Sequence, residues 1–177
     1  MRTCKFCKTK FEPIYSSVQM TCSISCSIDL TNLNSSKSWK KEKKKRKDAL
    51  KTNSDYVREL QVVFNKYIRL RDQAKGCISC NKPLNTKFDA GHFYSTGSYP
   101  ELRFHEDNVH GQCVHCNQHK HGNLLEYNIK IVDRIGNESL LILNNLRNIP
   151  KKYTIEELKG LKVLYNLKIK RLNDLML

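Results

Sequence analysis

The sequence predicts an α+β protein in which helices flank a small β-hairpin that is held together by bound metal. Three observations predict this class. Four segments repeat apolar residues at three- and four-residue steps, as amphipathic helices do. One short segment of strand-like composition lies between two Cys-x2-Cys pairs, and two further cysteine pairs lie near the amino terminus. With 177 residues, the chain can form one principal domain with small additions.

Composition excludes several classes of protein. No run of apolar residues approaches the ~18 that a membrane span needs, so we expect neither an integral membrane segment nor a membrane partner. Residues 1–10 lack the apolar stretch of a secretory signal, so the expected location is the cytoplasm. In that compartment the eight cysteines are better explained as metal ligands than as disulfides.

The formal net charge of +15 points to an acidic polymer as the partner, and nucleic acid is the first expectation. Much of this charge lies in residues 1–52, which hold 13 Lys and Arg against 4 Asp and Glu. We expect residues 37–52 to form a basic arm, either a solvated helix or a disordered segment, that contacts phosphates without reading sequence. The predicted contacts are Lys40, Lys41, Lys43, Lys44, Lys45, Arg46 and Lys47.

The cysteines form two groups with the spacing of structural zinc sites. A short pair lets two thiolates turn onto one ion, and two pairs complete a tetrahedron. The pairs are separated by 14 residues in the first group and by 32 in the second, so the second zinc closes a long loop. The first group is either a structural staple or a finger that also contacts phosphate. The predicted ligands are Cys4, Cys7, Cys22 and Cys26 for the first Zn2+, and Cys77, Cys80, Cys113 and Cys116 for the second.

Periodicity and capping signals predict the helices. The first runs from Ser54, as its N-cap, to Ala74. Two more are predicted over residues 123–134, ended by Gly136, and over 139–147. A capping box, Thr154-Ile-Glu-Glu157, opens the last helix. The apolar stripe of that helix packs either internally, which we favour, or against a second chain.

The loop closed by the second zinc predicts a β-hairpin. One strand is expected over residues 87–94, a loop rich in Gly, Ser, Thr and Tyr over 95–100, and a return limb over 102–110. The chain then passes through Cys113–Cys116 into a helix. The predicted order is therefore strand, strand and helix, with a Cys-x2-Cys pair at each end.

This order resembles the zinc-stapled ββα-metal core of HNH endonucleases. The residues that carry the resemblance are His92 in Phe88-Asp-Ala-Gly-His-Phe93, Asn108 in Glu106-Asp-Asn-Val109 and Asn117 in Cys113-Val-His-Cys-Asn117. Longer strings resemble the phage NinG (Rap) recombination-protein family, over roughly residues 4–172. They include Phe88-Asp-Ala-Gly-His92, Leu102-Arg-Phe-His-Glu-Asp-Asn-Val-His-Gly-Gln-Cys113, His121-Gly-Asn123, Thr52-Asn-Ser-Asp-Tyr56 and Phe64-Asn-Lys-Tyr-Ile-Arg-Leu-Arg-Asp72.

The resemblance implies a function. The family includes a structure-selective DNA endonuclease that resolves Holliday junctions and other branched recombination intermediates. An HNH-type, metal-dependent endodeoxyribonuclease of phage recombination, acting in the host cell cytoplasm, is therefore expected. Paired nicks at a four-way junction would be simplest for a homodimer, and a recombinase is a conceivable partner. Two alternatives stay open: a non-catalytic zinc-finger protein that binds DNA and assists recombination or replication, and an RNA-binding zinc protein.

The HNH pattern also implies roles for individual residues. His92 matches the general base that activates water, and Asn117 matches a ligand of a catalytic Mg2+ or Mn2+. Asn108 matches the residue that pins the hairpin loop through backbone hydrogen bonds. Lys120, one helical turn beyond Asn117, could meet the scissile phosphate or the leaving oxygen. We also expect Arg103 and Tyr94 to contact DNA.

One position departs from the HNH pattern. The residue before the base usually ligates the metal, but here it is Gly91. The nearest carboxylate, Asp89, is predicted on the opposite strand face from His92, and a bulge at Gly91 would let it fill the vacated ligand position. Alternatively, Asp89 orients His92 or a lysine, and the missing ligand is His119, His121 or water.

These signals divide the chain into four parts. A Cys4 zinc finger is expected over residues 1–36, followed by the basic arm over 37–52. An HNH-like nuclease domain with its leading helix is expected over 53–135, and a C-terminal helical region over 136–177.

Overall fold

In the computed structural model, which describes residues 1–175, the chain forms two compact units. The first is Met1–Lys51, and the second begins at Thr52. The division that we predicted between finger and arm, at residues 36 and 37, falls inside a single helix. Within the described residues, no helix combines the length and the apolar character that a membrane crossing requires.

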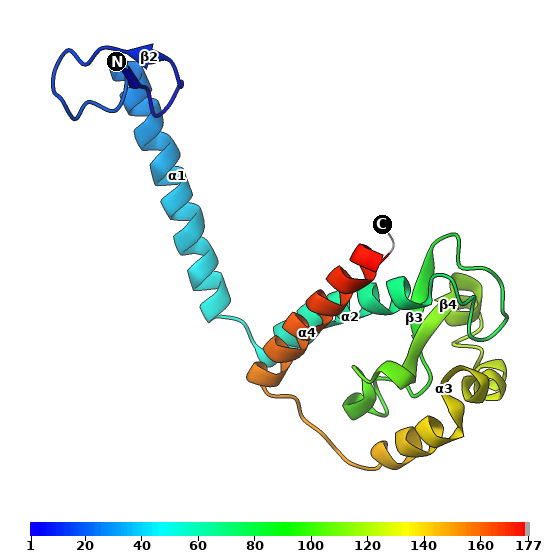
Figure 1. The fold of residues 1–177 in the computed structure, drawn as a ribbon. Helices are drawn as coiled ribbons and strands as arrows, with labels where there is room; N and C mark the ends of the chain where they lie inside the picture. The colour runs from blue at the N-terminus through cyan, green and yellow to red at the C-terminus, as the bar shows by residue number, and fades with distance from the viewer. Residues whose placement is uncertain (176–177) are drawn as a thin grey trace. The chain divides into compact units, whose positions relative to one another are not determined.

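The amino-terminal unit is a cysteine finger that continues into one long helix (Figure 1). Strand β1 (Arg2–Thr3) pairs antiparallel with β2 (Lys10–Phe11), and helix α1 (Ile24–Ala49) follows after a loop. Ser23 caps α1, because its side-chain oxygen accepts the N–H of Cys26 at 3.2 Å. No residue of α1 is buried, so the basic segment has the solvated-helix form of the two that were expected.

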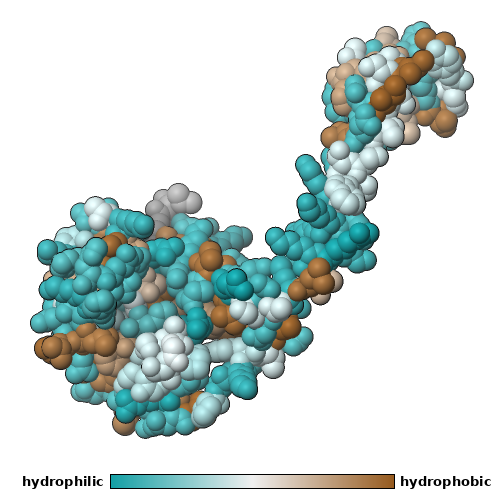
Figure 2. Space-filling view, turned by 180° about the vertical axis from the view of Figure 1, so that it is seen from behind, coloured by the Kyte–Doolittle hydropathy of each residue, from teal (hydrophilic) through white to brown (hydrophobic). Residues whose placement is uncertain are grey.

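The finger has almost no apolar core. Of residues 1–51, only Cys4 and Thr21 are buried. On the face shown in Figure 2, hydrophilic side chains cover the basic half of α1, whereas hydrophobic ones gather on the finger. Ile14, Tyr15 and Val18 are each at least 72% exposed. Buried apolar surface alone therefore cannot hold the fold of this unit, which agrees with the metal site predicted at its cysteines.

In the second unit, helix α2 (Asn53–Asp72) packs along helix α4 (Ile155–Leu175) (Figure 1). Thr52 caps α2, since its backbone N–H and its hydroxyl both donate to the Asp55 carboxylate, at 2.9 and 2.8 Å. The prediction of Ser54 as the N-cap is therefore wrong by two residues. The reason is that Thr52 and Asp55 have the spacing of a capping box.

The core between α2 and α4 confirms that the apolar stripe of the last helix packs internally. The predicted capping box of α4 is also confirmed, because Thr154 N–H donates to Glu157 Oε2 at 2.8 Å and Glu157 N–H donates to Thr154 Oγ1 at 3.2 Å. The Phe64 ring lies 4.8 Å from that of Tyr165, edge to face. The buried members of this core are Leu60, Phe64, Tyr67, Ile68, Phe104, Val109, Leu158, Tyr165 and Ile169.

The predicted hairpin is present, but its second strand lies later in the chain. Strand β3 (Phe88–His92) pairs antiparallel with β4 (Val109–Cys113). Of the return limb predicted over residues 102–110, only 109–110 belong to the strand, and the rest lies in turns that include the end of η1 (Pro100–Leu102) and all of η2 (Glu106–Asn108), two short 3-10 segments. A strand would turn Leu102 and Phe104 to one face, yet these two side chains are buried in different cores.

The hairpin lies between α2 and a second helix, α3 (Leu124–Leu146). The face that carries Ala90 and Val109 packs on the core of α2 and α4. On the other face, the Tyr127 hydroxyl of α3 donates to Gly91 O at 3.2 Å. The two predicted helices over 123–134 and 139–147 are confirmed as the two parts of α3, which meet at Gly136, where the backbone is not helical and φ is +81°.

Candidate active site and zinc centres

The two cysteine groups are assembled as predicted. Within each group the four sulfur atoms lie within 4.8 Å of one another, and all eight cysteines are free. The separations include 3.5 Å between Cys7 and Cys22 and 3.8 Å between Cys80 and Cys113. Four sulfurs at about 2.3 Å from a tetrahedral zinc would be about 3.8 Å apart. Each group could therefore hold a metal ion, and the geometry suits Zn2+.

The first Cys-x2-Cys pair of each group adopts the same tight turn. The residue after each pair, Lys8 or Asn81, has a positive φ, of 65° and 56°. In each turn the N–H of that residue donates to the carbonyl of the first cysteine, at 3.0 Å to Cys4 O and 2.9 Å to Cys77 O. The turns aim backbone N–H groups at the sulfurs, as zinc-bound thiolates require. Burial raises the pKa of Cys4, but N–H donors outweigh it and lower that pKa to about 6.

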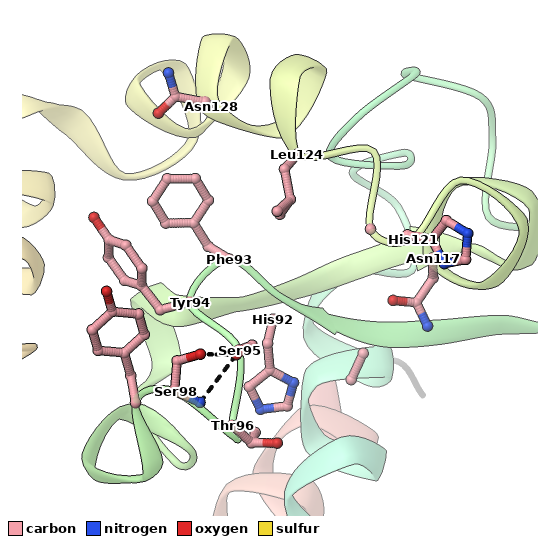
Figure 3. A pocket seen from close by; sticks show the side chains of 13 residues that line it. His92, Phe93, Tyr94, Ser95, Thr96, Ser98, Asn117, His121, Leu124 and Asn128 are labelled. Carbon is pink, nitrogen blue, oxygen red and sulfur yellow. Dashed lines mark hydrogen bonds between the residues drawn. The ribbon is translucent and has the colours of Figure 1, made fainter.

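A cavity of about 700 Å³ lies beside β3 and contains two of the predicted catalytic residues, His92 and Asn117. His92 comes from the end of β3, and Asn117 comes from η3 (His115–His119), a π-helical turn that also contains Cys116, the last cysteine of the second group. Figure 3 shows both side chains at the cavity together with His121. None of the residues that line this cavity is acidic, which favours a negatively charged ligand such as a phosphate group.

A backbone carbonyl holds the ring of His92. Nε2 of His92 lies 3.0 Å from Arg103 O, so a neutral ring that donates from Nε2 keeps Nδ1 free to accept a proton. Burial lowers the pKa of His92 below its ordinary value of 6.5, and this hydrogen bond offsets the effect only in part. The imidazole is therefore neutral near pH 7. The role of Arg103 O was not predicted, because a backbone contact leaves no signature in sequence.

The amide of Asn117 is oriented by Asp89. Asn117 Nδ2 donates to Asp89 Oδ2 at 2.9 Å, and Gln118 Nε2 donates to the same oxygen at 2.8 Å. The carbonyl oxygen of Asn117 is thus left on the side of His92 (Figure 3). The predicted bulge at Gly91 is wrong, because the register of β3 and β4 is unbroken. Asp89 instead reaches the site through Asn117.

Asn108 has the contacts predicted for it. The residue is fully buried, and its Nδ2 donates to Tyr94 O and to Leu102 O, both at 3.0 Å. Its Oδ1 accepts the N–H of Tyr94 at 2.8 Å, and its own carbonyl accepts the N–H of Phe93, also at 2.8 Å. Asn108 therefore pins both ends of the loop that follows β3, and with it the position of His92.

The remaining predicted residues lie at different distances from the cavity. His121 lines it, and this residue has a positive φ of 49°, a strained conformation that often marks functional sites. His119 and Lys120 are exposed on the same turn but do not line the cavity. The Arg103 side chain reaches toward Gln61, 3.5 Å from its Oε1.

Sequence reasoning singled out Tyr94 but missed the aromatic group around it at the cavity. Phe93 and Tyr94 have ring centroids 4.6 Å apart, and Tyr99 continues the group at 5.1 Å from Tyr94. Ser95, Thr96 and Ser98 add hydroxyl groups beside them. The loop rich in Gly, Ser, Thr and Tyr was the available signal, because such composition places aromatic faces and small polar groups together at a surface.

Comparison with known proteins covers nearly the whole chain. The family model described as Bacteriophage Lambda NinG protein matches residues 1–174. The chain belongs to the NinG family. Protein ninG of Escherichia phage 933W is 36% identical over 191 residues, which cover 98% of this chain and 94% of that protein. Protein ninG of Escherichia phage lambda is 43% identical over 129 residues, covering 73% and 63%. Protein ninG of Salmonella phage P22 is 41% identical over 131 residues, with the same coverage. No solved structure matches the chain.

The NinG match confirms the family to which the sequence pointed. Both cysteine groups and the cavity residues lie within the matched range. These NinG relatives carry names that state no reaction, so the reaction has to be inferred from the chemistry of the site.

Proposed function

We propose that this NinG-family chain is a metal-dependent endonuclease that hydrolyses phosphodiester bonds in branched DNA during phage recombination. One observation carries the proposal. A half-buried, neutral His92 lies with the carbonyl oxygen of Asn117 at a cavity free of acidic side chains, next to a zinc-type cysteine group. This is the combination that the resemblance to HNH endonucleases leads us to expect.

His92 acts as the general base. Its Nε2 is occupied by Arg103 O, so Nδ1 is the nitrogen that can take a proton from water. Because burial lowers the pKa of His92, the free base is present at neutral pH. Asn108 contributes by fixing the loop that holds Arg103 and His92 in register.

The residues at the cavity fit a divalent cation. Mg2+ prefers oxygen ligands, keeps several waters and takes the rest from a few protein oxygens and from substrate phosphates. Because no acidic side chain lines the cavity, the phosphate of the DNA would supply the negative charge that balances the cation. The structure offers the carbonyl oxygen of Asn117, whose orientation Asp89 fixes, beside a cavity of about 700 Å³ with room for waters. A cation bound there would supply positive charge to the phosphate and the leaving oxygen. Lys120 is exposed close to Asn117 in the chain, so its ammonium group could approach the DNA backbone.

The charge of the chain supports DNA as the substrate. The net charge is +15, and the basic segment of α1 is fully solvated, so its lysines are available to phosphates. The preference for branched DNA is inferred from the family resemblance. Phosphate contacts of this kind would add affinity for any DNA, whereas selectivity would have to come from the unit that carries His92.

The test is cleavage of labelled linear, forked and four-way DNA by zinc-loaded protein, with Mg2+ or Mn2+ and with EDTA. We expect His92→Ala to lose about 10²–10⁴-fold in cleavage rate, with DNA affinity and zinc content unchanged. His115→Ala is the matched control, because His115 is an exposed histidine on the turn that carries Asn117, and this variant should keep the rate. The wild-type rate should fall on acidification with a midpoint below pH 6.5, since only neutral His92 accepts a proton.

Two outcomes would contradict the proposal in different ways. Wild-type cleavage by His92→Ala would show that this histidine is structural. If the wild-type protein bound four-way DNA tightly but cut nothing with either metal ion, the alternative of a non-catalytic zinc-finger protein that assists recombination or replication would be correct.

A further inference from the structure

The glycine at position 91 is required by space rather than by backbone conformation. Its φ is not in the left-handed region, so any residue could adopt the backbone there. A Cβ at this position, however, would lie only 2.2 Å from Oε1 of Gln112 and 3.1 Å from Cβ of Gln112. The side chain of Gln112 therefore occupies the volume in which other HNH proteins are expected to place a metal ligand.

From that volume the side chain of Gln112 connects the hairpin, the second cysteine group and the turn that carries Asn117. It lies on β4, opposite Asp89, and is fully buried. Its Nε2 donates to Gly122 O at 2.6 Å and to Ser79 Oγ at 2.7 Å. Ser79 lies inside the Cys77–Cys80 turn, so the amide ties the hairpin to the second cysteine group.

Gly122 is the far end of the turn that carries Asn117. Its N–H donates to Asn117 O and to Cys116 O, both at 3.0 Å. The bond from Gln112 to Gly122 O thus closes the turn against the hairpin. Because a carbonyl oxygen only accepts, Nε2 must face Gly122, and this leaves Oε1 toward Gly91.

The free oxygen of Gln112 shows that this arrangement has a cost. Oε1 is buried and has no hydrogen-bond partner among the described residues. A buried, unpaired acceptor lowers the stability of the fold, so the two hydrogen bonds from Nε2 must offset that loss. A hydrophobic residue would fill the same space without this cost, but it could not hold Gly122.

We propose that Gln112 is a positioning residue for the cation-binding turn, and that Gly91 and Gln112 act as one unit. This rests on the proposed function. A side chain at position 91 and a glutamine at position 112 exclude each other. The oxygen ligand then comes from Asn117 on the turn, not from the residue before His92. This explains why the chain departs from the HNH pattern at Gly91 while keeping His92 and Asn117.

The test is a double-mutant cycle on the full zinc-loaded chain without DNA. The variants are Gly91→Ala, Gln112→Ala and the double variant, and the measurements are Mn2+ affinity, melting temperature and zinc content. Each single change should weaken Mn2+ binding by about tenfold, as loss of residues that orient ligands commonly does. The double variant should bind Mn2+ no more weakly than Gln112→Ala alone, because the new Cβ enters vacated space.

Two controls separate positioning from general stability. Leu172→Ala weakens the packing of α4 away from the turn, so it should lower the melting temperature without changing Mn2+ affinity. Ser79→Ala removes one acceptor of Gln112 but keeps the bond to Gly122 O, so its effect on Mn2+ should be smaller than that of Gln112→Ala.

The outcomes distinguish this proposal from the nuclease proposal. Losses that multiply in the double variant would show that positions 91 and 112 do not share volume. A Gln112→Ala effect on Mn2+ no larger than that of Leu172→Ala, or wild-type protein that binds no Mn2+, would overturn the positioning role. If the variants lost Mn2+ affinity in the coupled way described but the wild-type protein cut no DNA, the positioning role would stand and the nuclease proposal would be refuted.

Discussion

Replacing Asn108 by alanine should destabilise the second unit strongly. The change removes three hydrogen bonds from a fully buried side chain. Leu102 O keeps the N–H of His105 as a donor, at 3.1 Å, but the N–H and the carbonyl of Tyr94 lose the partners that hold them. Two partly buried backbone groups left unpaired cost about 1–3 kcal/mol each, so the expected loss in unfolding free energy is about 2–6 kcal/mol. That corresponds to a fall in melting temperature of about 5–25 °C for a unit of this size.

The measurement is urea unfolding of zinc-saturated protein by circular dichroism, with calorimetry for the melting temperature. Asn128→Ala is the matched control, because Asn128 lines the same cavity but is exposed, and it should change the unfolding free energy by less than about 0.5 kcal/mol. Asn108→Asp keeps the acceptor for Tyr94 N–H but sets an oxygen against two carbonyls, so it should be at least as harmful as alanine. A loss below about 1 kcal/mol for Asn108→Ala would refute the reasoning, since the loop would then be held by other contacts.

Three further changes test the metal centres and the basic segment. Metal analysis should find two zinc ions per chain, and less than about one zinc ion in folded protein would contradict this. Cys77→Ser should unfold the second unit, whereas Cys4→Ser should affect only the finger. Neutralising the basic residues of 40–47 should weaken binding to linear and branched DNA alike and reduce its salt dependence, so a loss confined to branched DNA would show that the segment reads shape. Asp89→Ala should raise the Mg2+ concentration needed for half-maximal cleavage, because Asn117 loses its orienting partner, and excess Mg2+ should restore part of the rate. An unchanged Mg2+ requirement would show that Asn117 needs no such partner.

The sequence by itself determined the features that depend on short segments. The two cysteine groups follow from spacing, because a pair two or three residues apart can turn onto one ion wherever it lies in the fold. The helices follow from apolar periodicity and from capping boxes such as Thr154 with Glu157. The pinning role of Asn108 followed from the family resemblance, and its hydrogen bonds agree with it.

Only the tertiary structure decided how the site is built. The return strand begins at Val109 because Leu102 and Phe104 are buried in two different cores. The composition of the segment does not show which core each side chain enters. Arg103 O holds His92, and Asp89 holds Asn117, through contacts between residues 11 and 28 positions apart. Such contacts depend on how the hairpin lies between its helices, and periodicity along one strand does not report them.

Position 91 shows the difference most clearly. The sequence shows a glycine where a ligand was expected, and strand geometry suggested a bulge that would bring in Asp89. The unbroken register removes that bulge, and the side chain of Gln112 fills the space instead. Gly91 and Gln112 are 21 residues apart, and their mutual exclusion is a matter of volume. Volume is a property of the packed chain, so the sequence could show that a side chain is missing but not what occupies its place.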